Sequence, residues 1–251
     1  MSADQRFLRH SAHEFLAANG TRLRAPAAIT QPGRVRAAYS FTSAGLAAQR
    51  PDGVVDDVHL CEQVVVDAVE EFTAVGDLVL DPFAGYGTTL VVASRMDRQV
   101  VGVELDESKV ELIRRRLAPG ARILHGDARE LARLVSGPVD LCVTSPPYMS
   151  SVDHPQNPLT AYRTLDGDYA RYLDELGAIL ADVAALLRPG GHLVVSAANI
   201  EENGVETPLA QDIAERASRH LALRQQISVE WDHPPSWMSA DCLLVFGRPD
   251  A

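Results

Sequence analysis

The sequence predicts an α/β fold in which a mostly parallel sheet carries helices on both faces. From about residue 58 onward, short apolar runs typical of buried strands alternate with amphipathic stretches of helical period. The chain has 251 residues, of which 46% are hydrophobic and 23% charged, and this suits one enzyme-sized domain with an appendage. A repeat array and a disordered chain are therefore disfavoured.

The predicted elements follow one another in regular alternation. Strands are expected at residues 77–80, 100–104, 121–125, 139–144, 191–197, 223–231 and 241–246, and helices at 58–76, 88–96, 107–117, 169–187 and 209–220. The last two strands are joined by the turn His233-Pro234-Pro235-Ser236, which indicates an antiparallel return. Breakers dominate residues 1–50, so we expect an Arg-rich N-terminal arm there and the main domain at residues 51–251.

Cysteine use and hydropathy bear on location. Cys61, Cys142 and Cys242 are isolated, with neither CxxC spacing nor a neighbouring histidine cluster, so a disulfide framework and a zinc site are disfavoured. No window approaches the roughly 18 consecutive apolar residues of a membrane span, and residues 1–20 lack a signal-peptide core. We expect a cytoplasmic protein without membrane contact.

Charge is distributed unevenly along the chain. Residues 1–50 carry seven arginines against Asp4 and Glu14, a net charge of +5, whereas the rest of the chain carries −16. Such an acidic body repels a polyanion except where a surface is locally positive. Wrapping of bulk duplex is therefore disfavoured.

The first motif is Asp81-Pro82-Phe83-Ala84-Gly85-Tyr86-Gly87-Thr88-Thr89, at the carboxyl end of the first predicted strand. Open α/β sheets bind ligands at this edge, and two glycines allow a tight turn and a close approach to a ligand. An ordinary strand-to-helix turn would look the same, so this loop alone is a weak signal.

Two acidic residues strengthen the interpretation. Glu104 ends the second strand of this unit, where a carboxylate can accept hydrogen bonds from two ribose hydroxyls. Gly126-Asp127-Ala128 follows the third strand, where Asp127 could meet an adenine amino group, although taken singly it is a typical helix cap. The loop matches neither GxGxxG nor the phosphate-cradling GK[ST], so a cofactor without phosphate, S-adenosylmethionine, fits best.

The second motif is Thr144-Ser145-Pro146-Pro147-Tyr148, after the fourth strand. Paired prolines stiffen the backbone and remove two donors, which leaves outward carbonyl acceptors. The Ser145 side chain and the Pro146 carbonyl could accept from the two N–H groups of an exocyclic amine and turn its lone pair toward a methyl donor. Tyr148 could stack on the ring, a contact worth roughly 1–3 kcal/mol per base. A proline-rich loop without chemistry is the alternative.

The two motifs together resemble the amino-methyltransferases that act on cytosine N4 or adenine N6, within the class I S-adenosylmethionine-dependent, Rossmann-like fold. The resemblance covers roughly residues 55–250 and implies a seven-stranded sheet whose last strand is antiparallel. It implies that Ser145, Pro146, Pro147 and Tyr148 hold the target amine and that Glu104 takes the ribose. It also implies a cofactor site formed by Asp81, Pro82, Phe83, Ala84, Gly85, Gly87, Thr88, Thr89, Glu104, Leu105, Asp127 and Ala128.

The acceptor is less well defined than the cofactor. Many DNA amino-methyltransferases carry PPY before the glycine loop, whereas the order found here also resembles tRNA guanine-N2 methyltransferases. Ser145 favours cytosine N4 or adenine N6, with DNA as first choice and a base that is flipped or single-stranded. A tRNA or rRNA base, a small molecule and a protein amide stay open as alternatives, and so does a non-enzymatic nucleotide-binding module.

Four further residues are weaker substrate candidates. Arg34 and Arg36 of the basic arm could contact phosphates, and Asp153 and His154 lie in a predicted active-site lid at residues 149–168. This insertion could cover a base but is too short to read a site. Trp231 and Trp237 flank the last turn, where core packing is favoured over base stacking. No metal is expected, because the amine can lose its proton to solvent after transfer.

Overall fold

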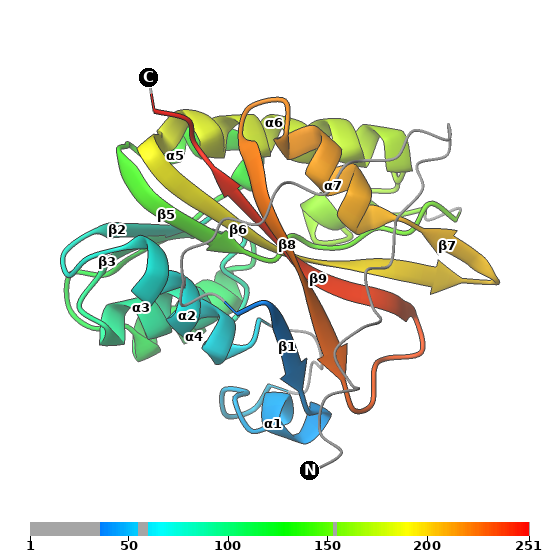
Figure 1. Ribbon diagram of the computed structural model, residues 1–251, viewed down its shortest axis with the longest axis horizontal. Coiled ribbons are helices and arrows are strands. Elements are labelled where there is room, and N and C mark those ends of the chain that lie inside the picture. Colours follow the sequence, from blue (N-terminus) through cyan, green and yellow to red (C-terminus); the bar gives the residue numbers. More distant parts are fainter. Residues whose placement is uncertain (1–35, 55–59, 153–154, 251) are drawn as a thin grey trace, which may run out of the picture. The chain divides into compact units, whose positions relative to one another are not determined.

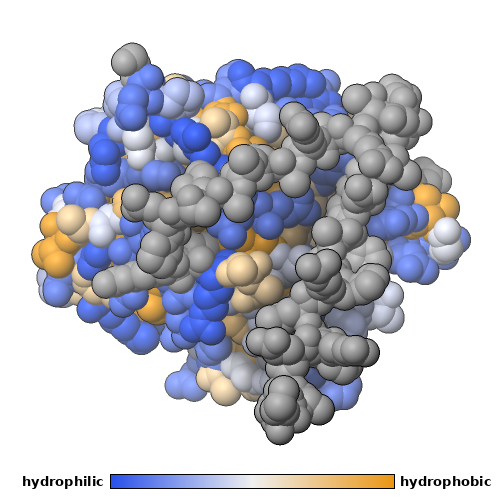
Figure 2. All heavy atoms as spheres, in the orientation of Figure 1, coloured by the Kyte–Doolittle hydropathy of each residue, from blue (hydrophilic) through white to orange (hydrophobic). Residues whose placement is uncertain are grey.

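The computed structural model describes residues 36–54, 60–152 and 155–250. Contacts divide the chain into residues 1–31, which lie outside the described ranges, and residues 32–251, to which everything below refers. Among the described residues, no helix has the length and the apolar character needed to cross a bilayer. The face in Figure 2 is mostly hydrophilic, and its hydrophobic residues form separate patches.

The described strands and helices alternate as predicted (Figure 1). The strands are β1 (Ala38–Phe41), β2 (Leu78–Asp81), β3 (Gln99–Glu104), β4 (Arg122–His125), β5 (Val139–Thr144), β6 (Leu187–Glu202), β7 (Val205–Thr207), β8 (Ala222–Trp231) and β9 (Met238–Gly247). The helices are α1 (Ser43–Ala47), α2 (Glu62–Phe72), α3 (Thr88–Arg95), α4 (Glu107–Arg116), α5 (Leu131–Leu134), α6 (Tyr169–Leu186) and α7 (Leu209–Ala217), with short 3₁₀ turns η1 (Ala128–Glu130) and η2 (Pro158–Thr160).

The strands form one sheet in the order β1-β8-β9-β6-β5-β2-β3-β4, with β7 paired to β6. Strand β9 runs antiparallel to both β6 and β8, which confirms the predicted antiparallel last strand. The sheet separates two hydrophobic cores. Helices α2, α3 and α4 cover one face, and α5, α6 and α7 cover the other (Figure 1). Alternate strand residues serve the two cores, as Val79 and Leu80 do in β2.

The strand count differs from the prediction, because the described part of the sheet has nine strands where seven were expected. The two additions are β7, a three-residue partner of β6, and β1, which pairs in parallel with β8 at the sheet edge. Neither has a sequence signal of its own, since a strand this short is stabilised by its partner and not by its pattern. Part of the predicted arm therefore lies in the sheet, while the boundary at residue 50 stays a prediction.

Candidate active site

The two motif turns lie side by side at one edge of the sheet. They follow β2 and β5, which are hydrogen-bonded neighbours. The Thr144 hydroxyl donates to the Asp81 carboxylate at 2.7 Å and so joins the end of β5 to the end of β2. Both turns line a single cavity of about 830 Å³. The juxtaposition on which the sequence interpretation depends is therefore present.

The glycine loop is shaped by two residues in the left-handed region, Gly85 at φ 54° and Gly87 at φ 82°. Gly87 caps α3, and a Cβ there would lie 2.9 Å from the Ile113 side chain. At Gly85 the nearest atom to an added Cβ is the Phe83 carbonyl at 3.8 Å, and Gly85 lines the cavity. Gly87 thus serves packing of the loop, whereas Gly85 keeps its surface open to a ligand.

Glu104 is held in place by the loops around it. One carboxylate oxygen accepts from the Gly85 amide and the other from the Asp106 amide, each at 2.8 Å. A carboxylate has about four acceptor positions, so these two bonds fix its orientation and leave capacity for two hydroxyl groups. Glu104 and Leu105 both line the cavity, which is where the sequence predicted a ribose.

Asp81 is 4% exposed and acts as an internal clamp. Besides Thr144, the Phe83 amide donates to it at 3.0 Å, and burial raises its pKa to about 6. The same cavity is lined by other residues of the predicted cofactor site, namely Pro82, Phe83, Ala84, Thr88 and Thr89. Asp81 therefore connects the two motifs, a role that the sequence did not indicate.

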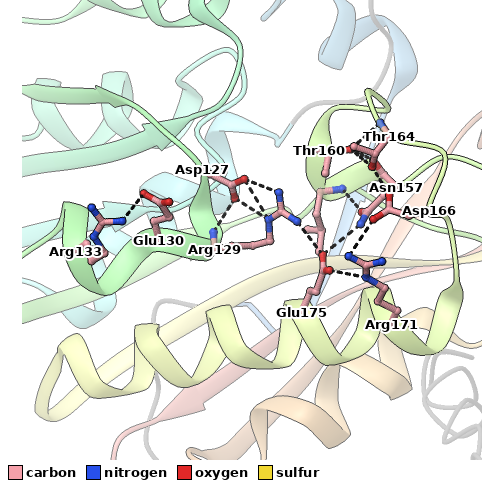
Figure 3. A network of polar contacts seen from close by, with 11 residues as sticks. Asp127, Arg129, Glu130, Arg133, Asn157, Thr160, Thr164, Asp166, Arg171 and Glu175 are labelled. Atoms are coloured by element: carbon pink, nitrogen blue, oxygen red, sulfur yellow. Dashed lines mark hydrogen bonds and ion pairs between the residues drawn. The ribbon is translucent and has the colours of Figure 1, made fainter.

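The Asp127 side chain forms a helix cap, which the sequence offered as the alternative to a contact with adenine. It caps η1 by accepting from the Arg129 amide at 2.9 Å, and it pairs with the Arg129 guanidinium at 2.7 Å (Figure 3). Its neighbours Gly126 and Ala128 line the cavity. The Asp127 carboxylate is paired with Arg129 and Asp127 is not in the described lining, so its contact with an adenine stays a prediction.

A lid covers the cavity from the loop before α6. Pro158, Leu159, Ala161 and Tyr162 line the cavity from this side. Figure 3 shows how the lid is attached. Glu175 of α6 accepts from the Asn157 side-chain amide at 3.2 Å and pairs with both Arg129 and Arg171. The lid, α6 and the turn after β4 are thus joined through one carboxylate.

The proline motif is fixed by hydroxyl groups. The Tyr148 hydroxyl donates to the Ser196 carbonyl at 3.3 Å and lies 3.4 Å from the Ser145 hydroxyl. The Tyr172 hydroxyl donates to the Pro147 carbonyl at 2.9 Å. The Pro147 carbonyl is therefore engaged, which leaves the Ser145 hydroxyl and the Pro146 carbonyl as the predicted acceptors for an amine.

A second cavity, of about 570 Å³, adjoins the first and was not predicted. Leu60, Ser145, Tyr148 and Trp237 line both, so the proline motif forms part of the wall between them. Its other walls come from β1, α1, the start of α2, and the β8–β9 hairpin. The signal that could have found it is the pair of tryptophans around Pro234-Pro235, which pack against the core as predicted and also line this cavity.

Of the four weaker substrate candidates, only Arg36 lies within the described residues. Arg34, Asp153 and His154 lie outside the described residues. Arg36 is exposed at the start of β1, where it pairs with Asp67 at 3.0 Å and lies over the Tyr39 ring. Its contact with phosphate stays a prediction.

The chain is similar to known methyltransferases in sequence and in fold. A model of the DNA methylase family of N6 and N4 methyltransferases matches residues 59–115. The structure of TrmN from Thermus thermophilus superposes with a TM-score of 0.55 at 24% identity, over 75% of this chain and 49% of that one. The fold is that of a class I methyltransferase. The resemblance drawn from the two motifs is confirmed at this level, while the roles of the individual motif residues stay predictions.

Curated relatives differ in their acceptors. A 4-amino-L-phenylalanine/4-methylamino-L-phenylalanine methyltransferase of Streptomyces pristinaespiralis is 33% identical over 53% of this chain and 50% of its own length. The type II methyltransferase M2.DpnII of Streptococcus pneumoniae is 37% identical over 24% of this chain and 20% of its own. A tRNA (guanine(10)-N2)-dimethyltransferase of Methanothermobacter thermautotrophicus is 31% identical over 51% of this chain and 37% of its own length. The chain thus spans half or less of these relatives.

Proposed function

We propose that this chain is an S-adenosylmethionine-dependent methyltransferase whose acceptor is an amino group conjugated to a ring. The observation that carries the proposal is the common cavity of the glycine loop and the proline motif, joined through Thr144 and Asp81. The fold and the match to DNA methylases support the same reaction.

Each side of the cavity has a distinct task in this proposal. The open surface at Gly85 and the fixed carboxylate of Glu104 bind and orient the cofactor, which supplies an electrophilic methyl group when bound. Ser145 and Pro146 accept from the two amine N–H groups, so the nitrogen lone pair is freed from the ring and directed at the methyl. Holding the two reactants in this geometry is the main catalytic contribution, because the amine needs no strong base before transfer.

The first candidate acceptor is the exocyclic amine of a nucleic acid base, at cytosine N4 or adenine N6 of DNA. The DNA methylase match favours it, and the relative acting on tRNA keeps an RNA base as the alternative. The base would have to be flipped or single-stranded, because its amine is inaccessible in the stack. The basic arm, with Arg34 and Arg36, is its predicted phosphate contact.

The second candidate is a small aromatic amine. The relative from Streptomyces carries such a substrate in its name, and the second cavity falls within the roughly 300–1,000 Å³ of small-molecule pockets. A free acceptor needs neither a basic groove nor a site-reading domain. A cytoplasmic location, expected from the unpaired cysteines, belongs to either version of the proposal.

The decisive experiment offers labelled S-adenosylmethionine with single-stranded DNA, tRNA, or 4-amino-L-phenylalanine, followed by analysis of nucleosides and products. Label in one pool identifies the acceptor class, and absence of label in all three would defeat the proposal. Salt provides a second readout. Methylation of a polymer would weaken steeply as salt rises, since phosphate contacts release counterions, whereas a small acceptor would show little slope.

A further inference from the structure

The second cavity has aromatic walls assembled from distant parts of the chain. Phe41 of β1 and Trp231 of β8 are in tilted contact with ring centroids 5.5 Å apart, and Trp237 meets Tyr148 edge-on at 6.1 Å. All four rings line the cavity. Aromatic faces carry negative electrostatic potential, so a cage of several rings favours planar or positively charged groups.

The wall made by the N-terminal segment is anchored to the hairpin. The Ser43 amide donates to the Asp232 carboxylate and the Ser43 hydroxyl donates to the His233 carbonyl, each at 2.8 Å. The Asp232 amide donates in turn to the Phe41 carbonyl at 3.2 Å. These bonds hold Phe41 against Trp231, so the cavity is built into the fold.

One carboxyl group stands among these rings. Asp241 of β9 is the acidic side chain in the described lining of this cavity, and the methyl-transfer step proposed above does not use it. Its oxygen accepts from the Trp231 indole N–H at 2.8 Å. Burial raises the pKa of Asp241 to about 6, and among the described residues no ion pair engages it, although Arg50 also lines this cavity. A carboxylate in such surroundings is stabilised by a ligand that donates hydrogen bonds or carries positive charge.

We propose that the second cavity binds the body of a small aromatic amine acceptor, and that Asp241 is the specificity residue for a second, cationic or hydrogen-bond-donating group on that acceptor. The inference rests on the proposed function, because Ser145 and Tyr148 in the shared wall place the reacting amine next to the cofactor cavity. Cytosine and adenine in a polymer have no donor besides the reacting amine, so Asp241 favours a free small molecule over these two bases.

The chain provides its own probe for binding. Its two tryptophans, Trp231 and Trp237, both line this cavity, so a ring entering it changes nearly all of the indole emission. The protein is titrated with 4-aminobenzylamine, which carries an aromatic amine and an ammonium group. The matched ligand is 4-methylaniline, which lacks the ammonium group. S-adenosylhomocysteine, the demethylated form of the donor, is present so that no turnover occurs.

We expect the wild-type protein to bind 4-aminobenzylamine about tenfold more tightly than 4-methylaniline, and Asp241→Asn to abolish this preference. Glu230→Gln is the matched control, since Glu230 is an exposed carboxylate on β8 outside the cavity lining and its loss should leave the preference intact. Equal binding of both ligands by the wild type, or an unchanged preference in Asp241→Asn, would overturn the proposal.

The remaining outcomes separate this inference from the proposed function. A single-stranded oligodeoxynucleotide that quenches the emission more strongly than either amine would reassign the cavity to an extruded base and overturn the proposal. If the amines bind through Asp241 and no acceptor is ever methylated, the cavity assignment stands and the proposed function fails. If methylation occurs while neither amine changes the emission, the proposed function stands and the cavity assignment fails.

Discussion

The two cavities on either side of the proline motif are built in different ways. The first is lined largely by short contiguous turns at strand ends, at residues 81–89, 104–106, 126–128 and 145–148, and its polar groups are fixed by backbone amides. The second combines side chains from the segments 41–50, 60–64, 145–148, 196 and 229–243, and four of them are aromatic rings: Phe41, Tyr148, Trp231 and Trp237. Among the described lining residues, Leu60, Ser145, Tyr148 and Trp237 belong to both.

On the proposed function, this contrast means that the two halves of the reaction are encoded at different levels of structure. The cofactor half depends on backbone geometry, so a few glycines and acids at fixed positions specify it. The acceptor half depends on tertiary packing, so substitutions can reshape it without disturbing the glycine loop. Such a division suits a scaffold that keeps one methyl donor and changes its acceptor, as the differing acceptors of the relatives illustrate.

The largest effect is expected at the glycine loop. Gly85→Val should weaken S-adenosylmethionine binding by more than about 100-fold, because a branched side chain in this open surface would occupy the ligand's place. Isothermal calorimetry measures the loss. Gly76→Val is the control, since Gly76 has a similar φ of 88° with open space around it. Equal loss in both variants would point to backbone strain, and normal binding in Gly85→Val would remove the loop from the cofactor site.

Each cavity has a buried carboxyl group that should make the stability of the protein depend on pH. Asp81 and Asp241 each have a pKa raised to about 6 by burial, so the folded state holds their protons more tightly than the unfolded chain does. Their contribution to stability is full below about pH 4 and is lost as pH rises through about 6, at most about 3 kcal/mol each. Urea unfolding across this window should show flatter profiles for Asp81→Asn and Asp241→Asn. Profiles as steep as wild type would contradict the assignment.

The shared wall should separate binding from turnover. Ser145→Ala should lower kcat roughly 10- to 100-fold and leave the affinity for S-adenosylmethionine near normal, because the hydroxyl is assigned to the amine and not to the cofactor. Tyr148→Phe is the milder companion, since it keeps the ring and loses the hydrogen bond to Ser196. Steady-state kinetics and calorimetry test both. An equal loss of affinity and turnover in Ser145→Ala would show that the roles are wrong.

The smallest effect is expected at the lid. Glu175→Gln should weaken S-adenosylmethionine binding a few-fold, because it loses the ion pairs with Arg129 and Arg171 that orient the carboxylate accepting from Asn157 of the lid. Acceptor binding, followed by tryptophan emission, should not change. Glu111→Gln is the control, since Glu111 forms a comparable exposed pair with Arg114 on α4. A change in acceptor binding alone would show that the lid serves the second cavity.

The first cavity could be predicted from the sequence more fully than the second. The alternation of apolar runs located β2 to β6, β8 and β9, since each places apolar residues in the core at its own period. The loop at Gly85 and the acid at Glu104 could be predicted because strand-end position alone determines what they face. The Asp81–Thr144 bond could not, because it joins residues 63 positions apart. Asp241 was missed for the same reason, since its surroundings come from β1, α2 and β8.

Strand β1 covers part of the edge of the sheet, so the domain needs the residues that form it. It is four residues long, yet it occupies the outer side of the ten-residue strand β8, which would otherwise end the sheet. Protein beginning at residue 42 would present bare backbone donors and acceptors of β8 to other molecules, and such edges recruit further strands. Removal of residues 1–41 should therefore cause self-association and, at the same time, take Phe41 out of the wall of the second cavity.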